Sequence, residues 1–188
     1  MFNVVQMRCA AVGAAICVAL ACAAAGVIAS AEPPPRVVRF MGANAAETLA
    51  GADRVEVFRV SAKRAREEDP EAGGYVVTAT GAGQGAAFAR RVANLLLDEK
   101  SYRFDANRVG GFQPVVVLKV WKGQRWVEVL LSFATDEIVV RSPGAKDGSV
   151  RSAQADASPA RRELLRLVRE ALPGDRELQS LAENSGAK

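Results

Sequence analysis

The chain has 188 residues, of which 49% are apolar and 24% charged, with a formal net charge of +4. It contains no histidine, which excludes Ser-His-Asp and Cys-His catalysis and every histidine-ligated metal site. The three cysteines, Cys9, Cys17 and Cys22, all lie in one apolar N-terminal stretch, so the rest of the chain has no thiol chemistry. A chain of this length is predicted to bury one core in a single domain.

Residues 1–31 are predicted to be a secretory signal peptide. Arg8 is the only charged residue before Glu32, and an almost unbroken apolar run follows it over 9–28. The run ends at the small residues Ala-Ser-Ala at 29–31. A charged start, an apolar centre and small residues before the cut are typical of a signal peptide. We expect cleavage before Glu32 and export to the periplasm or the exterior.

Two alternatives for this segment stay open. The apolar run is long enough to cross a bilayer, so residues 9–31 could remain as an anchor. Cys22 follows a sequence similar to a lipobox, which would make the protein a lipoprotein. The run is rich in alanine and ends at a good cleavage site, which favours cleavage. No twin arginine is present, which argues against export of a prefolded, cofactor-loaded enzyme. We expect no cofactor and a mature chain without cysteine.

The first half of the mature chain is predicted to alternate helices and strands. The proline-rich segment 32–43 should be extended, and a short helix should follow over 44–50. Polar and apolar residues alternate over 54–60, which predicts a half-buried strand, and a second strand is predicted over 75–80. Between them, the charged segment 61–73 is predicted to be a solvated loop.

The clearest β pattern comes later in the chain. Three strands are predicted as sequential hairpins over 115–121, 125–133 and 138–140. A two-residue turn that begins with Gly123 suits type II′. That register would pair Trp121 with Trp126. It would also pair Lys119 with Glu128, and each such pair is worth roughly 0.2–1 kcal/mol.

The remaining segments complete the predicted fold. The strongest helix signal covers 84–100, where apolar side chains repeat at i, i+4, i+7 and i+8. Residues 142–157 are rich in small and polar residues, which predicts a flexible linker, and a C-terminal helical segment is predicted over 158–184. We expect residues 44–141 to form an α+β domain. Its mainly antiparallel sheet should have about five strands, with a long helix packed on one face and a C-terminal helix beside it.

One glycine-rich motif, residues 81–86, follows a predicted strand and begins a helix. It fits the G-x-G-x-x-A pattern of dinucleotide-binding loops, in which backbone amides approach a pyrophosphate. The context does not fit, because the strands that follow are hairpins rather than βαβ units. We therefore interpret the motif as a turn that begins a helix.

Carboxylates are the remaining candidates for acid–base chemistry. Those near predicted elements are Asp98, Glu99, Asp105, Glu128, Asp136 and Glu137. A glycosidase-like mechanism needs two acids roughly 5–10 Å apart. A carboxylate-dependent hydrolase would therefore place two of these acids in one cleft. Because Glu128 is expected opposite Lys119, an ion pair is the simpler prediction there.

Two groups of side chains are candidate binding surfaces. Trp121, Trp126 and Tyr102 could form an exposed platform for carbohydrate or peptide, although aromatic residues on hairpins more often pack. The C-terminal helix carries a basic stripe, which would contact a polyanion, a cell-wall polymer or anionic lipid. The stripe consists of Arg161, Arg162, Arg166 and Arg169. Interleaved glutamates favour a solvated face instead, and without interleaved aromatic residues we expect no nucleic-acid binding.

Three short stretches resemble a group of small exported bacterial proteins without an assigned function. They are Ser101-Tyr102, GFQP at 111–114 and LLSFATD at 130–136. The resemblance spans residues 53–141 and implies an exported protein of unassigned role. That group has a cysteine before its F-x-P element and a later L-L-C-F-x-C segment.

This chain departs from the group at those cysteines. Gly110, Ser132 and Thr135 stand in their places, so a disulfide or thiolate metal site of the group would be absent here. The positions that match, including Tyr102, Phe112, Pro114 and Phe133, are structural in type. The resemblance therefore bears on the fold more than on an activity.

The leading hypothesis is an exported, non-enzymatic α+β domain that binds a partner protein or an envelope component. The surface we expect to bind is that of the hairpins over 115–141. The alternatives are a carboxylate-dependent envelope hydrolase and electrostatic attachment to an anionic surface through the C-terminal helix.

Overall fold

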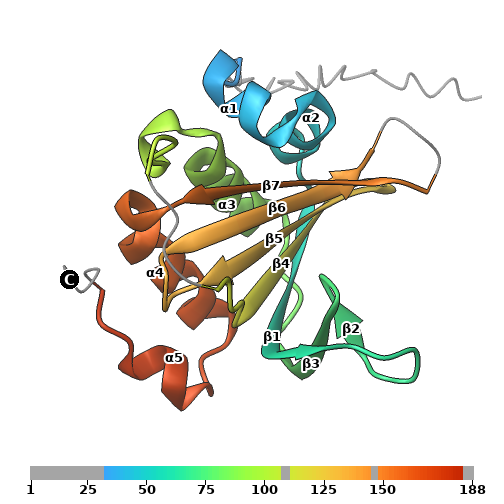
Figure 1. The fold of residues 1–188 in the computed structure, drawn as a ribbon, viewed down its shortest axis with the longest axis vertical. Helices are drawn as coiled ribbons and strands as arrows, with labels where there is room; N and C mark the ends of the chain where they lie inside the picture. Colours follow the sequence, from blue (N-terminus) through green and yellow to red (C-terminus); the bar gives the residue numbers. More distant parts are fainter. Residues whose placement is uncertain (1–31, 107–110, 145–147, 184–188) are drawn as a thin grey trace, which may run out of the picture. The chain divides into compact units, whose positions relative to one another are not determined.

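The computed structural model describes residues 32–106, 111–144 and 148–183. The predicted signal segment, 1–31, and Gly110 lie outside the described residues. With η for a 3₁₀ turn, the elements are α1 (Pro35–Met41), α2 (Ala43–Ala50), β1 (Arg54–Arg64), β2 (Glu71–Ala72), β3 (Tyr75–Thr80), α3 (Ala86–Leu97), η1 (Glu99–Ser101), β4 (Val116–Lys122), β5 (Arg125–Ser132), β6 (Glu137–Pro143), β7 (Val150–Asp156), η2 (Ser158–Ala160), α4 (Arg161–Ala171) and α5 (Arg176–Ser180) (Figure 1).

The described residues form one antiparallel sheet of seven strands in the order β2-β3-β1-β4-β5-β6-β7. The α+β class is confirmed, but the prediction of about five strands missed β2 and β7. The segment predicted as a linker over 142–157 contains the end of β6 and all of β7. β7 has the sequence VRSAQAD and no run of large apolar residues. It joins the sheet through backbone hydrogen bonds to β6. Such pairing does not require an alternating apolar pattern, so the sequence did not predict this strand.

The N-terminal segment also differs from its prediction. Residues 32–43 were expected to be extended, but helix α1 begins at Pro35. A proline in the first helical turn is tolerated because the amide it lacks would have no intrahelical partner there. Val37 and Met41, one helical turn apart, are buried in the core and hold the helix in place.

The central hairpin agrees with the sequence pattern, whereas the long helix is shorter than the predicted 84–100, because the chain becomes extended at Asp98. α3 runs from Ala86 to Leu97, and Phe88, Val92 and Leu96 are buried on one side of it. The β4–β5 hairpin has the predicted register, with Trp121 opposite Trp126 and Lys119 opposite Glu128. Gly123 begins its turn with φ +58°, the left-handed region that a glycine adopts without strain.

The helices pack on one face of the sheet. Alternate residues of the central strands, including Val57, Leu118 and Val129, are fully buried there against α1 to α4. The opposite face carries a second, smaller apolar cluster to which no described helix contributes. No helix of the described ranges is long and apolar enough to cross a membrane.

Candidate functional site

The face of the sheet opposite the helices, here called the helix-free face, carries three cross-strand rows of side chains. Their positions follow from the register of β1, β4, β5 and β6, because successive side chains of a strand point to opposite faces. The tryptophan row is Arg54, Trp121 and Trp126; the charged row is Glu56, Lys119, Glu128 and Arg141; the apolar row is Phe58, Val117, Leu130 and Val139.

The apolar row is covered by the chain itself. Between β1 and β3 the chain turns back over this end of the sheet, and Ala72 and Tyr75 pack against Val117 and Leu130. Val117 and Leu130 are consequently buried although no helix lies over them. This end of the helix-free face is therefore closed to a partner.

The charged row is compensated within the sheet. The side chain of Glu128 is only 9% exposed, with Lys119 Nζ 3.8 Å from Oε1 and Arg141 Nη1 3.2 Å from Oε2. The predicted Lys119–Glu128 ion pair is therefore present, and Arg141 adds a second cation. Because a cation lies beside each carboxylate oxygen and the side chain is nearly buried, the charge of Glu128 is compensated within the sheet.

The tryptophan row lies beside the β4–β5 turn, where both indole rings are partly exposed. Trp121 Nε1 donates a hydrogen bond to Glu56 Oε2 at 3.0 Å. The guanidinium of Arg54 lies 4.6 Å from the Trp121 ring centre. Lys119 Nζ lies 5.1 Å from the same ring centre and 5.6 Å from that of Trp126. These cation–π contacts orient both rings without burying them.

Tyr102, the third member of the predicted aromatic platform, does not join the two tryptophans. It belongs to the core on the helical face, where its ring packs against Phe40 and Phe104. Its hydroxyl donates a hydrogen bond to Leu96 O at 2.6 Å. Burial raises the pKa of Tyr102 well above its usual value, because the phenolate would lose its hydration. The platform therefore contains two aromatic residues, not three.

The arginines predicted as anion contacts do not form one basic surface. Arg161 is only 7% exposed. Its Nη1 donates to Phe133 O at 2.7 Å and pairs with Asp136, and its Nε donates to Ala182 O at 2.9 Å. A guanidinium with this many internal acceptors stabilises the fold and does not belong to a basic surface. The expectation of a surface cation at this position was wrong, because the folded chain brings the carbonyl oxygens of Phe133 and Ala182 within reach of this guanidinium.

The other three arginines of the stripe also have internal partners. Arg169 Nε donates to Leu178 O at 3.0 Å. Arg162 Nε lies 3.8 Å from Glu183 Oε2, and Arg166 pairs with Glu163 one turn earlier on the helix. The stripe mainly holds the segment that follows α4.

The candidate acids lie in several different places in the fold, and one adjacent pair, Asp136 and Glu137, lines a small cavity beside Arg161. Asp105 is exposed and binds Arg36 of α1, whereas Asp136 binds Arg161 of α4. Glu128 binds Arg141 of β6 on the helix-free face. Asp105, Glu128 and Asp136 are thus held on different arginines, whereas Glu99 shares Arg36 with Asp105. The hydrolase hypothesis predicted two acids in one cleft, and it stays a prediction for Asp136 and Glu137, the former already paired with Arg161. The described residues contain no group of three or more acids or other ligands that could hold a metal ion.

The glycine motif at 81–86 has a packing role. A Cβ on Gly81 would lie 2.6 Å from the carbonyl oxygen of Ala171 in α4, closer than real Cβ contacts allow. Val55 and Gln84 exchange two backbone hydrogen bonds, which fix the loop to β1. The motif thus lets α4 approach the sheet closely, in agreement with its interpretation as a turn.

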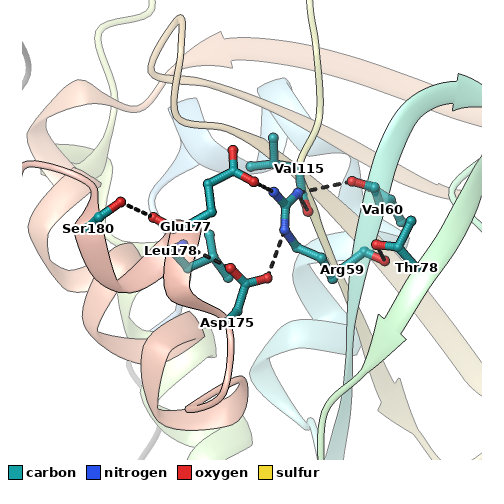
Figure 2. A network of polar contacts seen from close by, with 8 residues as sticks. All are labelled: Arg59, Val60, Thr78, Val115, Asp175, Glu177, Leu178 and Ser180. Atoms are coloured by element: carbon teal, nitrogen blue, oxygen red, sulfur yellow. Dashed lines mark hydrogen bonds and ion pairs between the residues drawn. The ribbon is translucent and has the colours of Figure 1, made fainter.

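One polar network of the fold has no counterpart among the sequence predictions. Arg59 of β1, whose side chain is 12% exposed, donates to Asp175 Oδ2 at 2.9 Å and to Glu177 Oε2 at 2.5 Å (Figure 2). Its Nη1 also donates to the carbonyl oxygens of Val60 at 3.0 Å and Val115 at 2.8 Å. An arginine in an otherwise alternating strand was the only signal. Its acidic partners are more than a hundred residues away in the chain.

Comparison with protein-family models, with curated proteins and with solved structures found no match for this chain. The resemblance to small exported bacterial proteins therefore stays a prediction, and the functional proposal rests on the geometry above.

Proposed function

We propose that the mature chain is an exported, non-enzymatic domain that binds another component of the cell envelope through the tryptophan row. The observation that carries this proposal is the position of the two tryptophans. The helices pack on one face of the sheet and the chain covers the apolar row of the other, whereas Trp121 and Trp126 stay partly exposed side by side. Aromatic residues with a cation beside them are enriched at binding surfaces.

The strands that carry the row favour binding through side chains. β4 and β5 are paired on both edges, so a partner cannot add a strand there. It must contact the indole rings and Arg54 directly. The ion pairs of the charged row keep the adjacent surface close to neutral, which favours aromatic contact over charge as the source of affinity.

The test is chemical cross-linking of the tagged chain in its own cells, followed by identification of what it captures. A Trp121→Ala/Trp126→Ala double variant should lose the captured component. The matched control is Arg90→Ala/Asn94→Ala, which removes two exposed side chains from the helical side of the molecule. If both double variants fold and retain the same component, the tryptophan row is not the binding surface.

Export is tested on the same material by intact mass. A chain that begins at Glu32 supports the proposal, because it shows removal of residues 1–31. An unprocessed chain or a mass that includes lipid at Cys22 would contradict a cleaved, exported domain.

A further inference from the structure

The last described segment, residues 175–183, is here called the C-terminal strap. It contains the five-residue helix α5 and follows α4 after Pro173 and Gly174. A helix of one turn has little stability alone in water, because nucleation fixes several residues for one hydrogen bond. The strap therefore owes its conformation to what holds it.

Arginines of α4 hold the backbone of the strap. Arg169 donates to the carbonyl oxygens of Leu178 at 3.0 Å, Gln179 at 3.3 Å and Leu181 at 2.5 Å. Arg161 adds a hydrogen bond to the carbonyl oxygen of Ala182 at 2.9 Å. Carbonyl oxygens are present in every peptide, so these contacts would accept another segment of the same shape.

Acidic side chains of the strap make a second set of contacts. Asp175 and Glu177 both bind Arg59 of β1 (Figure 2). Glu183 lies 3.4 Å from Arg169 Nη1 and 3.8 Å from Arg162 Nε. Charge-assisted pairs between guanidinium and carboxylate are the contacts by which arginine clusters recognise acidic peptides.

Two leucines anchor the strap by hydrophobic burial. Leu178 is fully buried in the core, and Leu181 packs against its edge. The strap thus contacts the face formed by α4 and Arg59 with an acid, a leucine, a second leucine three residues later and a further acid. Beside it, an open cleft of about 570 Å³ borders Arg59, Asp175 and Glu177, which leaves the acidic end of the strap accessible.

We propose that this face is a peptide-binding site that the chain fills with its own strap. Its second ligand would be an acidic segment of a partner protein that carries two leucines three residues apart. An acidic ligand follows from the charge of the site, since Arg59, Arg162 and Arg169 all contact acidic side chains of the strap. A second copy of this chain offers the same strap and gains nothing over the tethered one, whose local concentration is high.

The probe is a fluorescent peptide with the sequence of residues 174–183, GDRELQSLAE. It is titrated into the full mature chain and into the full-length variant Leu178→Ala/Leu181→Ala, whose own strap is weakened. Removal of the tethered competitor should tighten peptide binding by about tenfold or more. A control peptide with lysine in place of its acidic residues should not bind.

Hydrogen exchange provides the second readout and needs no variant. A large excess of the peptide should accelerate exchange at the amides of 175–183 in the unaltered chain and leave the sheet amides unchanged. Unchanged strap exchange, together with no binding to a folded double variant, would show that the strap is only a structural element. The chain could instead form a concentration-dependent dimer that exchanges straps and that the peptide does not dissociate. This result would identify a second copy as the occupant and overturn the proposal.

Discussion

The β4–β5 hairpin and helix α4 each carry regularly spaced side chains that are typical of a surface, but only the hairpin keeps both members of its set at least partly exposed. Trp121 and Trp126 lie side by side on the helix-free face, as their spacing predicts. The arginines of α4 were predicted to form a basic stripe, and Arg161 and Arg169 instead bind backbone carbonyls of the same chain.

The difference lies in what determines the direction of the side chains in each element. In a strand, the period of two separates the faces whatever else packs nearby, and the short turn sets the register. On a helix, long side chains can reach acceptors on segments that follow much later. Whether an arginine points to water therefore depends on where those segments lie.

The Arg161→Ala variant should lose about 3 kcal/mol of unfolding free energy, since it removes one partner of a mostly buried ion pair and leaves Asp136 without it. Arg166→Ala is the matched control on the same helix. Arg166 is 65% exposed and makes one ion pair, so its loss should cost less than about 0.5 kcal/mol. Urea unfolding measures both, and equal losses would mean that α4 carries a simple solvated stripe.

Close packing of α4 against the 81–86 turn gives the second prediction. The Gly81→Ala variant should lose about 1–3 kcal/mol of stability, because its Cβ would meet the Ala171 carbonyl oxygen at 2.6 Å. Gly83→Ala has nothing within 4 Å of the added Cβ and serves as the control. Thermal unfolding measures the stability of both variants. Equal stability losses would contradict the close approach of α4 to Gly81.

Tyr102 should make stability fall at high pH. Its folded-state pKa is raised, so the buried phenol stays neutral while the unfolded chain ionises above the ordinary value of 10. Stability is therefore greatest below pH 10 and declines as the pH rises through the folded value. Tyr102→Phe should flatten this decline and cost about 1 kcal/mol at neutral pH through the lost bond to Leu96 O. Denaturant titrations at several pH values measure this decline in unfolding free energy. If Tyr102→Phe declined as steeply as the unaltered chain at alkaline pH, burial of the Tyr102 hydroxyl would be contradicted.

The smallest effect is expected at the surface of α4. Arg91 donates to Glu170 and holds the pKa of that carboxyl below its ordinary value of 4.5. A lowered folded-state pKa means that the pair stabilises the fold above pH 4.5 and that this contribution is lost as the pH falls. Both side chains are more than 40% exposed, so Glu170→Gln should cost less than about 0.5 kcal/mol. A loss as large as that of Arg161→Ala would contradict the division into buried and exposed charges.

Several features could be predicted from residues close together in the chain. The register of Trp121 with Trp126 follows from one turn, and the buried side of α3 follows from the spacing of Phe88, Val92 and Leu96. Other features could not be predicted. β7 has no apolar run, and α1 begins at Pro35 in a segment whose composition is typical of an extended chain.

The candidate sites divide in the same way. Local periodicity and turn geometry were enough to predict the α+β class, the hairpin register and the pairing of the tryptophans. The burial of Tyr102 and the contacts of Arg59, Arg161 and Arg169 with the C-terminal strap depend instead on long-range packing. The partners of these side chains are distant in sequence, and a long polar side chain satisfies whichever acceptor the folded chain brings within reach.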